Sequence, residues 1–255
     1  MKSISLYTDR KSVLHSLDPI NKLYYIAFAI FIPIILPSIE ISLACVALSF
    51  TLLIAGKVFT KTMPAFGVVL FTLLTVILIQ GLFRPGNATI LFQAGPFTMY
   101  REGLLYASIL SLRVINIVSS FMILVLTTSP SDLVDSLVRK GMSPRIGYVI
   151  SSVFQIIPEM MAAMETITDA QRARGMETEG NLRVRIRAFF PLLGPVVLGS
   201  LINTKERAMA LEVRGFNAKS PKTYLLDQKQ YRFSTVIQWG ILFVIGCAIV
   251  WRLAS

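Results

Sequence analysis

The feature that most constrains how this chain can fold is a set of long apolar runs. There are five of them, at residues 20–36, 39–56, 64–83, 103–127 and 234–251. A helix needs about 20 mostly apolar residues to cross the hydrocarbon core of a lipid bilayer. Because the runs approach or reach that length, and 54% of all residues are hydrophobic, we predict an all-α polytopic membrane protein with about five transmembrane helices. The first run contains Pro33 and is only just long enough, so the crossings within residues 20–56 could also be divided differently.

The positions of the basic residues predict how these helices are oriented. The chain has 25 Lys and Arg against 14 Asp and Glu, which gives a formal net charge of +11. The basic residues gather in the N-terminal segment, in the loop after the second run and in residues 132–232. If the runs alternate in direction, all three regions lie on one side, and loops rich in Lys and Arg mark the cytoplasmic side. We therefore expect a prokaryotic cell membrane protein whose N-terminus and residues 132–232 are cytoplasmic. A basic membrane face also explains the charge without nucleic acid as a partner.

Residues 128–232 differ from the apolar runs because their apolar residues follow helical spacing. One stripe at intervals of three and four consists of Ile146, Val149, Val153, Ile157, Met160, Met164 and Ile167. Residues 183–214 repeat this amphipathic design, and residues 131–139 show it in a shorter form. Pro158 is expected to kink or break the first of these helices. We thus divide the chain into residues 1–127 with four transmembrane helices, a cytoplasmic region of amphipathic helices at 128–232, and residues 233–255 with the last transmembrane helix.

The two long amphipathic segments end in the same pair of residues. They read Gln-Arg-Ala-Arg-Gly-Met at 171–176 and Leu-Glu-Val-Arg-Gly-Phe at 211–216. Glycine just after a helix is the commonest C-cap, and arginine near a helix C-terminus is favoured by the helix dipole. For one pair alone, a helix cap is the simpler interpretation. Two equivalent pairs also fit a docking role, in which Arg174 and Arg214 hold carboxylates of a partner.

Some polar or sulfur-containing residues in or beside the apolar segments admit two interpretations. Arg113 lies within the fourth run, where a charge costs about 2.5–3.5 kcal/mol on insertion scales and is usually paired or functional. We favour pairing with a backbone carbonyl or a role in holding the helices together over a polar seam with the cytoplasmic region or a partner, and Asn116 is one helical turn away. Asp18 followed by Pro19, with Lys22 one turn on, predicts the N-cap and first position of the first helix. The methionines at 160, 161 and 164 suit either a core or an adaptable contact surface.

We find no sequence signal for catalysis, a cofactor or a metal. The chain has one histidine, His15, and its two cysteines, Cys45 and Cys247, lie inside apolar runs. The pair Gly56-Lys57 lacks the first glycine and the hydroxyl residue of a phosphate-binding loop. We therefore expect a non-enzymatic chain that takes any energy for its work from another subunit.

Taken together, these motifs resemble the transmembrane (T) component of energy-coupling factor (ECF) transporters, the EcfT/CbiQ-like family. The resemblance rests on Leu14 to Pro19 with Lys22, Arg101-Glu102-Gly103, Leu112-Arg113, Thr127 to Pro130 with Asp132-Leu133, Ile157-Pro158, and the two Arg-Gly pairs. This chain departs from the family at Gln155, where arginine is common, and at Val213, where a smaller residue is common.

The resemblance implies a role for each of these sites. Two ABC-type ATPase subunits would bind the cytoplasmic helices at Ala173-Arg174-Gly175 and Val213-Arg214-Gly215. A small membrane protein, the substrate-binding S component, would contact Met160, Met161 and Met164. That protein would select the substrate, so a vitamin and a transition metal both stay open, with a vitamin or vitamin precursor favoured. The alternatives are a membrane-anchored scaffold for an unrelated partner and a secondary transporter with its own substrate site.

Overall fold

The computed structural model describes residues 12, 14–15, 17–85, 89–94, 97–176, 181–218 and 234–254. The chain divides into two compact units. We call residues 5–140 with 230–255 the bundle unit, and residues 141–229 the hairpin unit. The N-terminal segment up to residue 11 and the basic residues within 219–233, which enter the prediction of orientation, lie outside the described residues.

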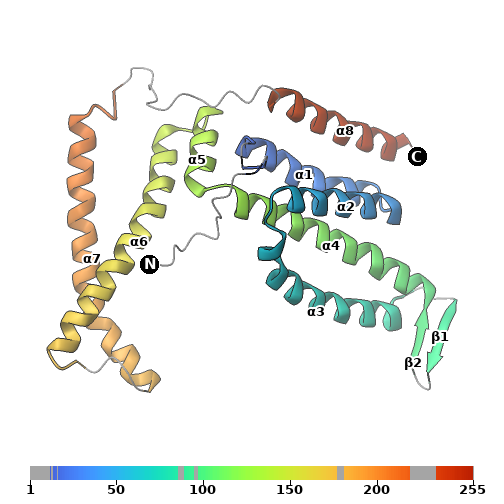
Figure 1. The fold of residues 1–255 in the computed structure, drawn as a ribbon, viewed down its shortest axis with the longest axis horizontal. Coiled ribbons are helices and arrows are strands. Elements are labelled where there is room, and N and C mark those ends of the chain that lie inside the picture. The colour runs from blue at the N-terminus through green and yellow to red at the C-terminus, as the bar shows by residue number, and fades with distance from the viewer. Residues whose placement is uncertain are drawn as a thin grey trace. The chain divides into compact units, whose positions relative to one another are not determined.

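The bundle unit contains all five predicted apolar runs as helices, which confirms the all-α polytopic fold class. Its helices are α1 (Pro19–Ile35), α2 (Ile39–Ala55), α3 (Phe59–Phe83), α4 (Arg101–Thr127), the short α5 (Pro130–Arg139) and α8 (Ser234–Ala254). Two short strands that the sequence did not predict, β1 (Ile90–Ala94) and β2 (Phe97–Tyr100), pair antiparallel between α3 and α4. The hairpin unit contains α6 (Pro144–Ala173) and α7 (Leu182–Val213). Figure 1 shows all of these elements in chain order by colour.

The set of helices that could cross a membrane differs from the predicted set. By length and composition, five helices of the described residues qualify: α3, α4, α6, α7 and α8. Helices α1 and α2 are apolar but shorter, with 17 residues each. Helices α6 and α7, predicted to be too polar, qualify because their charges lie largely outside one apolar stretch; in α7, residues 188–204 carry no charge. Both findings agree with a multi-pass membrane protein.

Helix α4 lies at the centre of the bundle unit and contacts α1, α2 and α3, while α8 packs against α1 (Figure 1). The apolar core next to it includes Leu53, Val58, Ile123 and Leu126. Small polar residues are buried in the same interior: Ser42, Ser49, Ser111, Ser119 and Ser120. Small side chains let helix backbones approach closely, which is how helices commonly pack where the hydrophobic effect between them is weak.

Candidate functional site

Helices α6 and α7 run antiparallel and pack against each other (Figure 1). Near one end, the ring of Tyr148 in α6 lies 5.3 Å from the ring of Phe216, which follows α7. Further along, Arg207 of α7 donates two hydrogen bonds to the carboxylate of Glu159 in α6, at 2.5 and 2.7 Å. Helix α6 is continuous through Pro158. The pairing makes α6 and α7 one helical hairpin.

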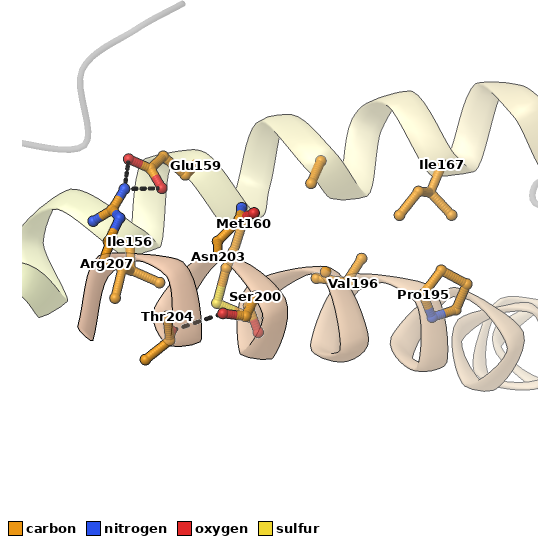
Figure 2. Close-up of a pocket in the computed structure, with 12 residues that line it drawn as sticks. Ile156, Glu159, Met160, Ile167, Pro195, Val196, Ser200, Asn203, Thr204 and Arg207 are labelled. Atoms are coloured by element: carbon orange, nitrogen blue, oxygen red, sulfur yellow. Dashed lines mark hydrogen bonds and ion pairs between the residues drawn. The ribbon is translucent and has the colours of Figure 1, made fainter. Parts of the chain in front are cut away.

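A pocket of about 150 Å³ lies between the two helices, beside the Glu159–Arg207 ion pair. Figure 2 shows side chains of α6 and α7 meeting there, with Met160 reaching from α6 toward α7. Small residues of both helices, Ala163 and Gly199, leave the space open. The pocket is too small for a drug-sized ligand, since such sites measure about 300–1,000 Å³.

The three methionines that the sequence singled out lie in different surroundings. Met160 lines the pocket between the helices, and Met164 is half-buried. Met161 is 57% exposed. The apolar stripe of α6 also divides: Ile167 lines the pocket against α7, whereas Val149 near the start of α6 is 60% exposed. The hairpin therefore packs with part of its apolar surface and presents the rest.

The first Arg-Gly pair forms a helix C-cap at the end of α6. Arg174 is the capping residue, and Gly175 follows with φ of +85°. The amide of Gly175 donates to the carbonyl of Arg172 at 2.9 Å, and the amide of Met176 donates to the carbonyl of Gln171 at 3.0 Å. These two bonds define a Schellman motif, in which glycine takes the left-handed conformation without a Cβ clash.

The second pair repeats this motif at the end of α7. Arg214 is the capping residue, and Gly215 has φ of +71°. The amide of Gly215 donates to the carbonyl of Glu212 at 2.9 Å, and the amide of Phe216 donates to the carbonyl of Leu211 at 3.0 Å. The helix-cap interpretation is thus confirmed for both pairs, and it concerns the backbone alone.

The side chains of the two capping arginines are exposed. Within the described part of the chain, neither guanidinium group has a hydrogen-bond or ion-pair partner. Their apolar neighbours are exposed as well: Ala173 beside Arg174, and Val213, which is 90% exposed, beside Arg214. Because the helices are antiparallel, the two arginines lie at opposite ends of the hairpin. Their separation is on the order of one helix length, roughly 45 Å for 30 residues.

Arg113 of α4 is partly buried, and its Nε atom is buried without a hydrogen-bond partner in the described part of the chain. The amide of Asn116, one turn away, is bonded to other groups: it donates to the carbonyl of Ala29 and accepts from Ser49. The structure thus gives Arg113 no hydrogen bond to Asn116, and it shows none from its buried Nε to a backbone carbonyl in the described part of the chain. Among the described residues no group of three or more His, Cys, Asp or Glu side chains is placed to hold a metal ion.

The sequence analysis assigned only a capping role to the start of α1, and the structure adds to it. Asp18 accepts a hydrogen bond from the amide of Ile20, and Pro19 follows it at the first helical position, as predicted. Lys22 is 4% exposed and reaches α4. The position of Lys22 in the first turn of an apolar run could have predicted this contact, because a long basic side chain there must reach water or a polar partner.

Comparison with known proteins places this chain among transport proteins. The sequence model of a family described as CbiQ, cobalt transport protein, matches residues 10–225, which includes both Arg-Gly pairs. An energy-coupling factor transporter transmembrane protein EcfT of Streptococcus equi is 31% identical over 233 residues, covering 85% of this chain and 84% of the relative. Proteins of the same name from Staphylococcus aureus and Bacillus subtilis are 29% and 28% identical, over 97% and 86% of this chain and 94% and 86% of their own lengths.

Proposed function

The chain belongs to the CbiQ/EcfT family of membrane transport proteins, and we propose that it is the transmembrane coupling subunit of an ECF-type ABC importer. In this role it links ATP hydrolysis by two partner ATPase subunits to uptake through a small substrate-binding membrane protein. The chain itself is non-catalytic and needs no cofactor. It lies in the prokaryotic cell membrane with its N-terminus and the hairpin unit on the cytoplasmic side.

The observation that carries this proposal is the repeated end of α6 and α7. The same Schellman motif fixes Arg174 and Arg214 at equivalent positions, and both guanidinium groups are exposed. A cap alone requires glycine and a suitable backbone, but it does not require arginine at the preceding position. Arginine is suited to bidentate contact with carboxylates, and exposed apolar neighbours such as Val213 would bury on contact.

Two docking residues at opposite ends of one hairpin fit two ATPase subunits, one at each end. Movement of those subunits would be passed to α6 and α7 through Arg174 and Arg214. The ion pair between Glu159 and Arg207 and the packing around Met160 would hold the helices together during that movement. The exposed apolar surface, including Val149 and Met161, would be covered by the small membrane protein and the bilayer.

In this proposal the small membrane protein selects the substrate. We propose a vitamin or vitamin precursor in preference to a transition metal ion. The small membrane protein that copurifies with this chain decides between the two classes, because its binding of each can be measured directly.

The test is a detergent pull-down of the full-length tagged chain from its native cells, with partners identified by mass spectrometry. The double variant Arg174→Glu/Arg214→Glu is compared with the wild type. Lys205→Glu is the matched control, because Lys205 is exposed on α7 and lies away from both ends of the hairpin. We expect ABC-type ATPases with the wild type and the control, and none with the double variant.

Two other results would change the proposal. If the double variant retains the same ATPases, the coupling surface lies elsewhere and the Arg-Gly pairs are helix caps only. If the wild type brings down no ATPase, the importer proposal is wrong. A membrane-anchored scaffold for an unrelated partner, or a secondary transporter, would then be the function to test.

A further inference from the structure

The first turn of α1 contacts the ends of several other helices in the bundle unit. Asp18 caps α1 through one carboxylate oxygen, and its other oxygen accepts a hydrogen bond of 2.9 Å from Ser234 at the start of α8. Asn21 accepts a hydrogen bond of 2.8 Å from the side-chain amide of Gln238, one turn further into α8. Asn21 and Gln238 are 5% and 7% exposed, so this contact is buried.

Lys22 connects the same turn of α1 to the end of α4. Its ammonium group donates to the carbonyl oxygen of Thr127 at 3.0 Å and to the hydroxyl of Thr128 at 2.8 Å. These residues close α4, whose last carbonyl groups have no partner within the helix. Lys22, a residue of α1, therefore caps the C-terminus of α4.

Gln238 joins this cluster to the end of α5. Its side-chain oxygen accepts a hydrogen bond of 3.1 Å from the ammonium group of Lys140, and its amide nitrogen donates to Asn21. Lys140 is the capping residue of α5, and Gly141 follows with φ of +115° and open space where a side chain would begin. Lys140, whose side chain is bonded to Gln238, is thus followed directly by Gly141, a residue with unusual backbone freedom.

Two of the boundaries between the units lie next to residues of this cluster in the sequence. The bundle unit ends at Lys140 and resumes at residue 230, shortly before Ser234. Lys140 is bonded to the cluster through Gln238. The hydroxyl of Ser234 lies within hydrogen-bond distance of both Asp18 and Asn21 and can donate its one hydrogen to either. An unmade hydrogen bond is costly for a buried polar group, which favours these contacts, although the side-chain nitrogen of Asn21 has no partner in the described part of the chain.

We propose that Gln238 is a positioning residue for coupling. Through its hydrogen bonds to Lys140 and Asn21, it holds the end of α5, where the chain leaves the bundle unit, to the first turn of α1. Movement of the hairpin unit then reaches α1, and through Lys22 also α4, rather than being absorbed by rotation at Gly141. This inference rests on the proposed function, since it concerns how motion from the ATPases enters the membrane helices.

The chain contains its own reporter for this movement. Cys45 of α2 is buried against Ile32 of α1 and Ala248 of α8. Its rate of modification by N-ethylmaleimide therefore measures how often the contact between these helices opens. Cys247 is exposed and is replaced by alanine, so that Cys45 is the cysteine of this chain that reports. The modified Cys45 peptide is quantified by mass spectrometry in the purified complex, with and without ATP.

The variants Gln238→Leu, Lys140→Met and their combination are compared on this background. Thr235→Val is the matched control, because Thr235 is exposed on the same turn of α8. We expect ATP to change the Cys45 rate in the parent and in the control. Each single variant should lose most of that change while it retains ATP hydrolysis, and the double variant should lose no more than either single variant. Lys140 is exposed, so Lys140→Met decides the matter if Gln238→Leu fails to accumulate.

Three results overturn the inference. They are an unchanged Cys45 response in Lys140→Met, losses that add in the double variant, and a parent whose Cys45 rate does not respond to ATP. Failure of the proposed function is recognised separately, because a chain that copurifies no ATPase fails in the pull-down before any labelling is done.

Discussion

The side-chain amide of Asn116 in α4 donates a hydrogen bond of 2.8 Å to the backbone carbonyl of Ala29 in α1. Ala29 lies four residues before Pro33, which has no N–H to offer that carbonyl. Asn116 is fully buried, and the hydroxyl of Ser49 in α2 donates to its side-chain oxygen at 2.6 Å. A proline is tolerated inside an apolar helix where a neighbouring helix satisfies the freed carbonyl. Asn116 therefore completes α1 and joins three helices.

We predict that Asn116→Leu destabilises the protein by about 1–3 kcal/mol, because it leaves the buried carbonyl of Ala29 unsatisfied, whereas Ser49 keeps its hydrogen bond with Tyr25. Adding Pro33→Ala should recover part of the loss, since alanine restores the N–H that bonds to Ala29 within α1. Thermal unfolding in detergent measures both effects. Ser108→Ala is the control, because that hydroxyl bonds to Leu104 of its own helix. Equal stabilities of Asn116→Leu with and without Pro33→Ala would show that the proline is not what Asn116 compensates.

The sequence predicted the helices well because each signal it used is local. The apolar runs set the lengths of α1 to α4 and α8, Asp18 and Pro19 set the start of α1, and Gly175 and Gly215 set the ends of α6 and α7. Each of these depends on residues within a few positions of one another. Residues close in the sequence are therefore sufficient to indicate them, without knowledge of the tertiary contacts.

The sequence did not predict which surfaces meet, because periodicity defines an apolar face but not its partner. The stripe of α6 reads as one continuous face, yet Ile167 packs at α7 while Ile146 is 54% exposed. Contacts distant in sequence were missed for the same reason. Lys22 and Thr128 are 106 positions apart, and Asn21 and Gln238 are 217 apart. Arg174 and Arg214 show a second limit. Local residues determine their cap geometry, but whether they dock a partner depends on another molecule, which the sequence of this chain does not contain.

Lys22→Met should destabilise the bundle unit by about 1.5–3 kcal/mol, the range for hydrogen bonds to charged groups. Methionine fills much of the same space but leaves the carbonyl of Thr127 and the hydroxyl of Thr128 without their donor. Hydrogen exchange at the C-terminal turn of α4, together with thermal unfolding in detergent, measures the effect. Lys205→Met, at an exposed position of α7, is the control. If both lysine variants unfold at the same temperature as the wild type, the cap on α4 contributes no stability.

The ion pair between Glu159 and Arg207 should contribute modestly to the hairpin unit. Both side chains are substantially exposed, at 50% and 35%, so solvent screens the attraction. We expect a coupling energy of about 0.2–1 kcal/mol in a double-mutant cycle of Glu159→Gln and Arg207→Gln. The cycle is measured by thermal unfolding at low and high salt, and the coupling should shrink as salt rises. A coupling that does not change with salt would mean that the pair acts through packing of the arginine stem instead.

The cap and docking roles of the Arg-Gly pairs can be separated by substituting the glycines. At φ of +85° and +71°, alanine at 175 or 215 costs roughly 1–2 kcal/mol, although no atom lies within 3.8 Å of the added Cβ. Hydrogen exchange at the amides of Met176 and Phe216 should therefore become faster in these variants. Gly67→Ala in α3 is the control, since Gly67 is helical with open space around it and alanine favours a helix.

The same variants bear on docking because Arg174 and Arg214 remain present but lose a fixed backbone. If the ATPases recognise the guanidinium groups at set positions, Gly175→Ala and Gly215→Ala should weaken their copurification with this chain, and less so than Arg174→Glu/Arg214→Glu. If ordering of the cap is the only cost, the loss of affinity should match the roughly 1–2 kcal/mol of strain, about five- to thirty-fold. Faster exchange at Met176 and Phe216 with unchanged ATPase binding would show that docking does not use the capped geometry.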